Sequence, residues 1–257
     1  VPQSLFIFAH QDDEYAAAPW IVEEMASYNN IACAYLTDGG ARAQPEIRDR
    51  ESTRALRSLG VPESRIGFLT VGSERVRDGE LFRKPLEARD ALEAWIERTE
   101  VDPARIYAPA YEGGHPDHDV AYAIAGSVAT RRGKAEKCWH FALYNGYRCP
   151  KPFYSTLRQL PTQARSRRTI LPIEARAQLA AFCRFYPSQW RTWLGLLPGA
   201  TFERLLGRES VVQFEPARLR ERPHPGPLLY ERLFSTSYDT VAESMRPLVD
   251  ELCVPSV

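Results

Sequence analysis

The chain has 257 residues, with 33 lysines and arginines against 33 aspartates and glutamates, so its formal net charge is zero. With 44% apolar and 26% charged residues it has the composition of a globular protein, which excludes the disordered and fibrous classes. The balanced charge argues against a dedicated nucleic-acid-binding protein. No apolar run reaches the length of a transmembrane segment, and we expect no signal peptide because no basic segment precedes an apolar one at the start.

Cysteine usage indicates a reducing compartment. The five cysteines are odd in number and form no CxxC pair, which predicts neither a disulfide framework nor a thiolate zinc site. They are Cys33, Cys138, Cys149, Cys183 and Cys253. We therefore expect free, buried or incidental thiols and a cytoplasmic location.

Short apolar runs alternate with helical patterns over the first 150 residues. Strands are predicted at Ser4–Ala9, Ile31–Thr37, Ile66–Val71, Arg105–Pro109 and Cys138–Leu143. Helices are predicted at residues 12–30, Glu46–Leu59, Pro85–Thr99 and Asp117–Thr130. This alternation predicts an α/β fold with a mostly parallel sheet and helices on both faces.

The pattern becomes irregular after residue 150, where prolines are frequent. Helices remain at Glu174–Phe185 and Thr240–Glu251. We expect two parts: a sheet domain over residues 1–150, and a Pro-rich lobe over residues 151–257 that packs on it and shapes the substrate site.

The segment Tyr186–Leu206 is rich in leucine and tryptophan. Its apolar spacing predicts a packed pair of helices broken at Pro198–Gly199. An alternative interpretation is an interfacial surface that receives an amphiphilic substrate such as a glycolipid, with membrane-surface contact.

Two polar segments follow predicted strands. His10-Gln11-Asp12-Asp13-Glu14 follows the first strand, and Gly113-Gly114-His115-Pro116-Asp117-His118-Asp119 follows the fourth. Both lie at the carboxyl ends of strands, where α/β sheets bind ligands. Three of the five histidines of the chain fall within these two segments.

These residue types suit a catalytic metal site. Such a site takes three His, Asp or Glu ligands and needs a nearby carboxylate as general base. His10 and Asp13, with His118 approaching from the second segment, could be the ligands, and Asp12 could face the reacting water. A structural explanation competes with this one, because acidic residues at a helix start are also good caps.

The remaining members of the second segment also have candidate roles. His115 could lie on the opposite side of a reacting carbonyl and stabilise the oxyanion or protonate the leaving amine. Asp117 could orient an imidazole.

The motifs AHQDDE and EGGHPDHD resemble the hallmark motifs of the LmbE/PIG-L family, (P/A)HPDDE and HPDH. DGG at Asp38–Gly40 and RDRESTRALRSLGV at Arg48–Val61 resemble further blocks of that family. The resemblance covers about residues 4–145, and Ser188-Gln189 resembles a short family feature beyond them.

The resemblance implies a Rossmann-like fold and zinc-dependent removal of acetyl or other acyl groups from N-acetylglucosamine-containing substrates such as glycolipids, glycosides or glycoconjugates. It implies one Zn²⁺ per chain on His10, Asp13 and His118, with Asp12 as general base. The resemblance also implies that His115 is the electrophilic partner in the reaction.

Two further roles are implied by the resemblance. Asp117 supports His115, and Arg48 contacts substrate; the alternative for Arg48 is a charge on a helix surface. Gln11 departs from the family motif, which has proline there. Because proline fixes φ, its loss could loosen the turn that aims His10 and Asp13.

Two other functions remain open. A non-catalytic sugar- or lipid-binding protein could keep the fold, but Asp12 and His115 argue against it. A magnesium-dependent phosphoesterase is the other, although a site with two histidines suits zinc better.

Overall fold

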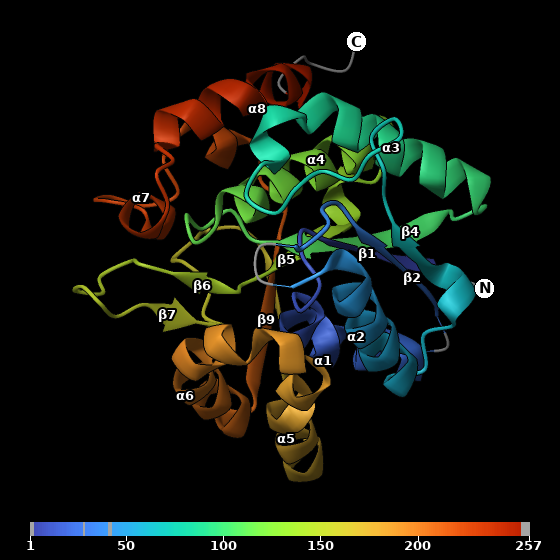
Figure 1. Ribbon diagram of the computed structural model, residues 1–257, viewed down its shortest axis with the longest axis vertical. Coiled ribbons are helices and arrows are strands. Elements are labelled where there is room, and N and C mark those ends of the chain that lie inside the picture. Colours follow the sequence, from blue (N-terminus) through green and yellow to red (C-terminus); the bar gives the residue numbers. More distant parts are fainter. Residues whose placement is uncertain (1–2, 28, 41–42, 253–257) are drawn as a thin grey trace.

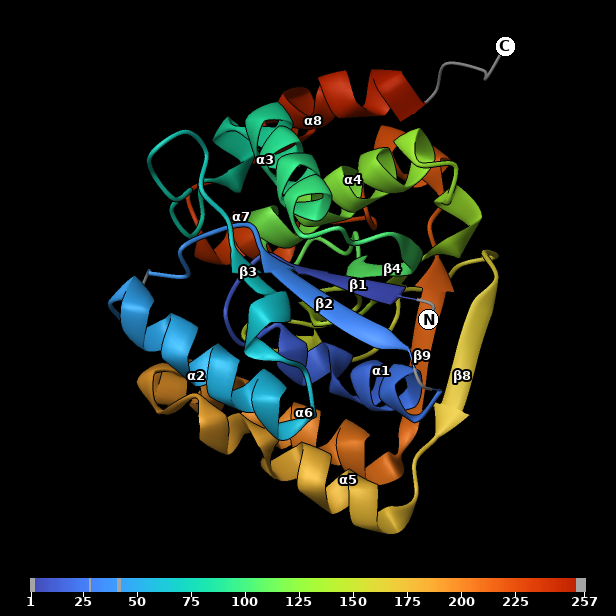
Figure 2. The same cartoon turned by 90° about the vertical axis from the view of Figure 1, so that its right-hand side faces the viewer.

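The computed structural model describes residues 3–27, 29–40 and 43–252; Cys253 lies outside them. A seven-stranded sheet runs through the molecule in the order β3-β2-β1-β4-β5-β9-β8 (Figures 1 and 2). The five strands from β3 to β5 are parallel, and β9 and β8 continue the sheet in antiparallel pairing. The predicted mostly parallel α/β sheet is confirmed.

The strands lie close to their predicted positions in the first half of the chain. They are β1 (Gln3–Phe8), β2 (Asn30–Tyr35), β3 (Ile66–Phe68), β4 (Pro103–Pro109), β5 (Cys138–Phe141), β8 (Ser166–Ile170) and β9 (Arg208–Gln213). Two short strands, β6 (Tyr144–Asn145) and β7 (Ser155–Thr156), form a separate antiparallel pair.

Helices cover both faces of the sheet. Figure 2 shows α3, α4 and α8 on one side of the central strands and α1, α2, α5 and α6 on the other. Their bounds are α1 (Glu14–Ala26), α2 (Pro45–Ser58), α3 (Pro85–Arg98), α4 (Pro116–Arg131), α5 (Ile173–Ala180), α6 (Trp190–Leu206), α7 (Leu229–Leu233) and α8 (Tyr238–Leu252).

Alternate residues of β1 pack into two hydrophobic clusters, one on each face of the sheet. Leu5 and Ile7 pack in the cluster shared with α3, α4 and α8, whereas Phe6 and Phe8 pack in the cluster shared with α1 and α2. Because successive side chains of a strand point to opposite faces, a continuous apolar run is what a strand buried on both faces requires.

A buried carboxylate ties α1 to the sheet. Glu24 accepts hydrogen bonds from Ser4 Oγ (2.7 Å), Tyr107 OH (2.6 Å), Asn29 Nδ2 (2.5 Å) and Arg105 Nη1 (2.9 Å). Burial alone would raise the pKa of Glu24, but the hydrogen bonds and the charge of Arg105 outweigh it and lower that pKa.

The second half of the chain is more regular than the sequence indicates. β9 pairs with β5, and β8 pairs with β9, so residues from this half complete the same sheet. Neither strand is predicted from the sequence. β8 is an edge strand whose five residues alternate between exposed and half-buried, so it lacks an apolar run.

The predicted break at Pro198–Gly199 is wrong, because α6 runs unbroken from Trp190 to Leu206. Pro198 cannot donate a hydrogen bond to the carbonyl group of Leu194, but Leu194 lies on the exposed side of the helix, with 66% of its surface exposed, where a helix can continue past a proline. The packing expected of this segment holds for Trp193 and Ala200, which are buried. Several other apolar side chains of α6 are exposed, among them Trp190, Phe202 and Leu205.

No helix in the described parts of the chain is long and apolar enough to cross a membrane. The four cysteines within those parts are free thiols, and Cys33 and Cys138 are buried.

Candidate metal centre and active site

The strand order brings the two polar segments together. β1 and β4 are neighbouring parallel strands, and the chain continues from β1 to β2 on one side and from β4 to β5 on the other. This reversal of strand order is the usual position of a binding site in such sheets. His10 follows β1, and His115 and His118 lie at the start of α4, which follows β4.

Three potential ligand atoms form a compact triangle. His118 Nε2 lies 3.1 Å from Asp13 Oδ1 and 3.2 Å from His10 Nδ1, and the remaining side, from His10 Nδ1 to Asp13 Oδ1, is 3.9 Å. Ligands about 2.0–2.1 Å from a tetrahedral zinc ion lie about 3.3 Å apart. All three side chains are buried. The donor set and its spacing therefore fit a zinc ion.

The turn after β1 holds Asp13 in place. Asp13 Oδ2 accepts hydrogen bonds from the backbone amides of Ala9 (2.8 Å) and His10 (2.9 Å), which leaves Oδ1 facing His118. Burial would raise the pKa of Asp13, but the charge of His118 and these hydrogen bonds lower it to about 2. The carboxylate is thus kept ionised, as a metal ligand must be.

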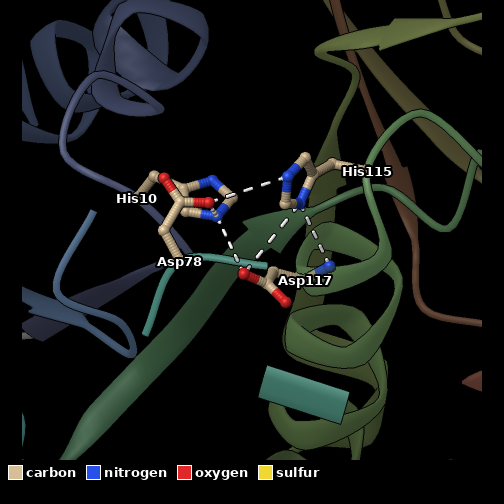
Figure 3. Close-up of side chains that lie close together, drawn as sticks. All are labelled: His10, Asp78, His115 and Asp117. Carbon is tan, nitrogen blue, oxygen red and sulfur yellow. Dashed lines mark hydrogen bonds and ion pairs between the residues drawn. The ribbon is translucent and has the colours of Figure 1, made fainter. Parts of the chain in front are cut away.

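His10 is oriented through its other ring nitrogen. His10 Nε2 lies 3.0 Å from Asp117 Oδ2 and 3.2 Å from Asp78 Oδ1 (Figure 3). Such carboxylates fix the tautomer and leave the opposite nitrogen free to bind a metal. The resemblance pairs Asp117 with His115. In the structure the Asp117 carboxylate lies closer to His10 than to His115 Nδ1, which is 4.0 Å away, and the Asp117 backbone amide donates to His115 Nδ1 (3.2 Å).

A second group of possible ligands consists of His10, Asp78, His115 and Asp117. In this group Asp117 is already occupied, because its two carboxylate oxygens accept hydrogen bonds from the backbone amides of Gly79 (2.6 Å) and Leu81 (2.9 Å). The triangle of His10, Asp13 and His118 is therefore the better metal site, and the second group supports it.

Asp12 lies at the mouth of this site in an unusual backbone conformation. Its φ is 135°, a region that residues other than glycine rarely adopt. Asp12 Oδ1 is 3.3 Å from Arg48 Nη2. Burial raises the pKa of Asp12 to about 6, although the Arg48 charge opposes the shift. A carboxylate with this pKa is suited to accept a proton near neutral pH.

Arg48 is buried, with 2% of its surface exposed, so the interpretation as a helix-surface charge is wrong. It donates hydrogen bonds to the carbonyl groups of Gly39 (2.8 Å) and Gln11, and it lines the cavity over the site. Through its contacts with Gln11 and Asp12, Arg48 links the first motif to α2, the helix that carries it.

His115 faces the same cavity from the α4 side. Burial and the nearby charge of His10 lower the pKa of His115 to about 4, so this imidazole is neutral near pH 7. It packs edge-on against Phe234, with ring centroids 4.9 Å apart. A neutral imidazole here can donate a hydrogen bond to an oxyanion.

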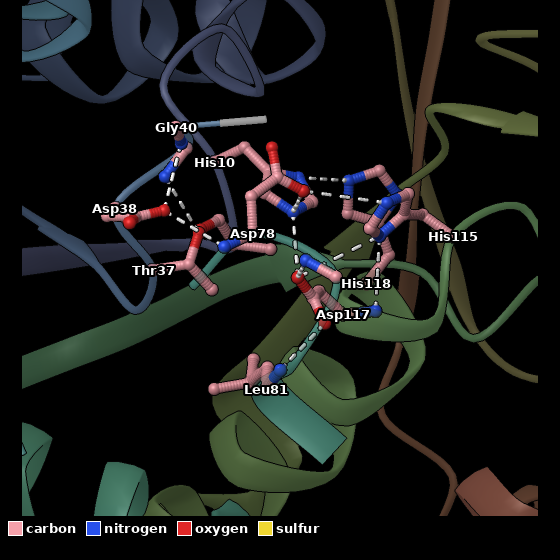
Figure 4. Close-up of polar contacts among 12 residues, drawn as sticks. His10, Thr37, Asp38, Gly40, Asp78, Leu81, His115, Asp117 and His118 are labelled. Carbon is pink, nitrogen blue, oxygen red and sulfur yellow. Dashed lines mark hydrogen bonds and ion pairs between the residues drawn. The ribbon is translucent and has the colours of Figure 1, made fainter. Parts of the chain in front are cut away.

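Asp78 is a site residue that the sequence analysis missed. Its backbone amide donates to Asp38 Oδ1 (2.9 Å), and the same oxygen accepts from Gly40 N (2.9 Å), so the DGG block anchors the loop that carries Asp78 (Figure 4). That loop follows β3, so the rule that directed attention to the ends of β1 and β4 could have identified it.

Gln11, which replaces the family proline, is fully buried. Its side-chain amide donates to Asp49 Oδ1 (2.9 Å) and to the carbonyl group of Thr37 (3.3 Å), and Arg75 binds the same two partners. These bonds tether the turn that proline would stiffen. Gly39 packs directly against the Gln11 side chain, since a Cβ at Gly39 would lie 2.0 Å from Gln11 Oε1.

A cavity of about 310 Å³ opens over the site. His10, Asp12, Asp78 and His115 line its floor, and residues of α6 and α7 line its walls, including Arg191, Leu196 and Leu233. The second half of the chain thus contributes directly to the cavity.

Glu51 on α2 fixes another part of the cavity wall. It accepts hydrogen bonds from Ser188 N (2.9 Å) and Ser188 Oγ (2.5 Å). The next residue, Gln189, is buried, lines the cavity and donates to Ser188 Oγ (3.3 Å). The Ser188-Gln189 pair therefore lies at the site, far in sequence from both motifs.

Residues 5–129 match the sequence family described as PIG-L: GlcNAc-PI de-N-acetylase. These residues belong to the PIG-L, or LmbE-like, family. No curated protein sequence matches the chain.

Solved structures, among them two deacetylases, share the fold. The A40926 pseudoaglycone deacetylase Dbv21 is 17% identical, with a TM-score of 0.59 over 82% of this chain and 96% of its own. The N,N'-diacetylchitobiose deacetylase from Pyrococcus horikoshii is 17% identical, with a TM-score of 0.53 over 81% and 82%. A conserved protein from Thermus thermophilus is 19% identical, with a TM-score of 0.58 over 90% and 97%.

Proposed function

We propose that the protein is a zinc-dependent hydrolase that removes an acetyl or other acyl group from the amide of an N-acetylglucosamine-containing substrate. The observation that carries this proposal is the triangle of His10 Nδ1, Asp13 Oδ1 and His118 Nε2 with Asp12 beside it, where His10 and Asp12 line an open cavity. The family description and the two named deacetylases support an N-acetyl amino sugar as the substrate class. One similar structure, of teicoplanin deacetylase Orf2, is a zinc-inhibited form, which supports zinc binding by this fold.

His10, Asp13 and His118 would hold the ion, one per chain. A zinc ion there would polarise the amide carbonyl and acidify the attacking water. Asp12 takes the proton of that water as it attacks the carbonyl carbon, because its carboxylate faces the cavity and is ionised above a pKa of about 6.

His115 stabilises the negative charge that develops on the amide oxygen by donating a hydrogen bond. Its lowered pKa makes it a poor proton source, so the protonated Asp12 returns the proton to the departing amine. The products are a carboxylic acid and a free amino sugar. Asp117 and Asp78 hold His10 in its ligating orientation.

Arg48 and residues 151–257 would act on the substrate. Arg48 lines the cavity beside Asp12, where it can contact a sugar hydroxyl group. Gln189, Arg191 and Leu233 come from the second half of the chain and shape the walls. A glycolipid is one candidate substrate, because Leu233, which lines this cavity, is exposed.

The competing functions make different predictions for the same variant. In a hydrolase, replacing Asp12 with alanine abolishes turnover while zinc is retained. A non-catalytic sugar- or lipid-binding protein would keep its ligand affinity after this change, and a phosphoesterase would act on phosphate esters with magnesium.

The deciding experiment is elemental analysis of protein purified without chelator, beside a His10→Ala/His118→Ala double variant. We expect about one zinc per chain, lost in the variant. A panel of N-acetylated sugars, followed by assay of the released amine, then tests the reaction. Absence of tightly held zinc, even after zinc is added back, would refute the hydrolase assignment.

A further inference from the structure

A second, smaller cavity of about 60 Å³ adjoins the open cavity at the ligand triangle. Asp13 and His118 line only this small cavity, whereas Asp78 and His115 line only the large one. His10, Asp12, Tyr144, Thr192 and Leu196 line both. The two cavities therefore meet where the reaction would take place.

The walls of the small cavity are mainly apolar apart from the reacting groups. They include Ala16 of α1, Leu143, Leu157, and Trp193, Leu196 and Ala200 of α6. The only other polar groups on its wall are the side chains of tyrosine, threonine and tryptophan. Such a surface favours a hydrocarbon chain over a sugar ring.

Close packing of α6 limits the size of this cavity. Gly199 brings the helix against β7, since a Cβ at Gly199 would lie 2.6 Å from Thr156 Oγ1. Gly195, one turn earlier, does the same against Tyr154, whose hydroxyl oxygen would lie 2.6 Å from an added Cβ. A water-sized group needs up to about 15 Å³ of such space, and at that figure the cavity of about 60 Å³ admits about four.

We propose that the small cavity is the acyl subsite and that Leu196 and Ala200 limit the acyl chain to about four carbons. This inference rests on the proposed hydrolysis of an N-acyl amino sugar. The carbonyl carbon lies at the junction of the two cavities, the acyl chain enters the small one, and the sugar occupies the large one. The opposite orientation fails, because a hexose ring exceeds the volume of the small cavity.

Binding of the product acids tests this subsite without turnover. The probes are acetate, propionate, butyrate and hexanoate, titrated calorimetrically into the zinc-loaded protein. Each buried methylene strengthens binding by about fourfold at most. We expect affinity to rise from acetate to butyrate and to fall at hexanoate.

Two variants change the cavity in opposite directions. Ala200→Leu fills it, and we expect butyrate binding to fall about tenfold or more while acetate binding changes far less. Leu196→Ala enlarges it, and we expect the preferred acid to become longer. Leu205→Ala is the matched control, because Leu205 lies on the exposed side of the same helix and should leave the series unchanged. Because Leu196→Ala only removes volume, it serves even if Ala200→Leu misfolds.

The proposal is overturned if hexanoate binds the unmodified protein more tightly than butyrate. It is also overturned if Leu196→Ala leaves the order of acids unchanged. Rates on N-acetyl-, N-propionyl- and N-butyrylglucosamine separate this outcome from failure of the proposed function. If the protein hydrolyses an N-acyl sugar but Leu196→Ala leaves the order of acid affinities unchanged, only the subsite is refuted. If the acids bind in the expected order but no N-acyl sugar is hydrolysed, only the proposed substrate class is refuted.

Discussion

Replacement of the two adjacent aspartates with asparagine should separate catalysis from metal binding. Asp12→Asn keeps the shape of the side chain and its contact with Arg48 but removes the proton acceptor. Because asparagine has the same shape as aspartate, it meets the φ of 135° with no new steric conflict. A general base contributes a rate factor of about 10²–10⁴, or about 3–5 kcal/mol of the barrier. We therefore expect kcat to fall by that factor with full zinc content.

Asp13→Asn should give the opposite result. It weakens the ligand atom that lies 3.1 Å from His118 Nε2, so we expect zinc content to fall well below one per chain. The assays are zinc per chain by elemental analysis and release of free amine from an N-acetylated sugar. If Asp12→Asn retains more than about a tenth of the turnover at full zinc content, Asp12 is not the base. Loss of zinc from Asp12→Asn would show that the ligands are assigned wrongly.

Three other substitutions test the groups around the site and in the core. Glu51→Gln weakens the charge-assisted bonds to Ser188, so steady-state kinetics should show a KM about three- to tenfold higher with smaller change in kcat. Gln11→Ala removes the bond to Asp49, and denaturation should show an unfolding free energy about 1–3 kcal/mol lower; an unchanged value would show that the tether is dispensable. Glu24→Gln should lower the unfolding free energy by about 1–3 kcal/mol at pH 7. Because the folded-state pKa of Glu24 is lowered, this contribution is present above the unfolded pKa and is lost as pH falls through the folded one, so the two proteins should converge in acid.

The sheet and the positions of both motifs could be predicted because the relevant signals are local. β1 to β5 are short apolar runs, and each polar motif directly follows one of them. Given a parallel sheet, the carboxyl ends of such strands share one edge. Placement of His10 beside His118 follows from this rule together with the pairing of β1 with β4.

The partners of the histidines could not be predicted, because they depend on loop conformation. Asp117 is two residues from His115 in sequence, yet its carboxylate turns toward His10 and accepts the amide of Gly79. Asp78 reaches the same imidazole from the loop after β3; the strand-end rule indicates this loop, but no motif shows which of its residues faces His10. Such contacts are set by tertiary structure and leave no periodic pattern in the sequence.

The second half of the chain lacks clear local signals for a different reason. β8 and β9 pair antiparallel at the edge of the sheet, where one face is partly solvated and charged residues are tolerated. In α6, Pro198 reads as a break, although a helix can continue past proline when the unbonded carbonyl group reaches solvent. Both features require knowledge of which side faces water.

The contacts of α2 connect chemistry to substrate recognition. Arg48 reaches back to Asp12, while Glu51, one turn later, holds Ser188 and thereby the cavity wall at Gln189. A helix is rigid over one turn, so the two contacts fix the distance between the general base and that wall. Substrate-dependent movement of α6 would therefore be transmitted to Asp12 through α2. It follows that changes in the α6 wall should alter kcat as well as KM while Glu51 is intact, and KM alone once Glu51 is replaced.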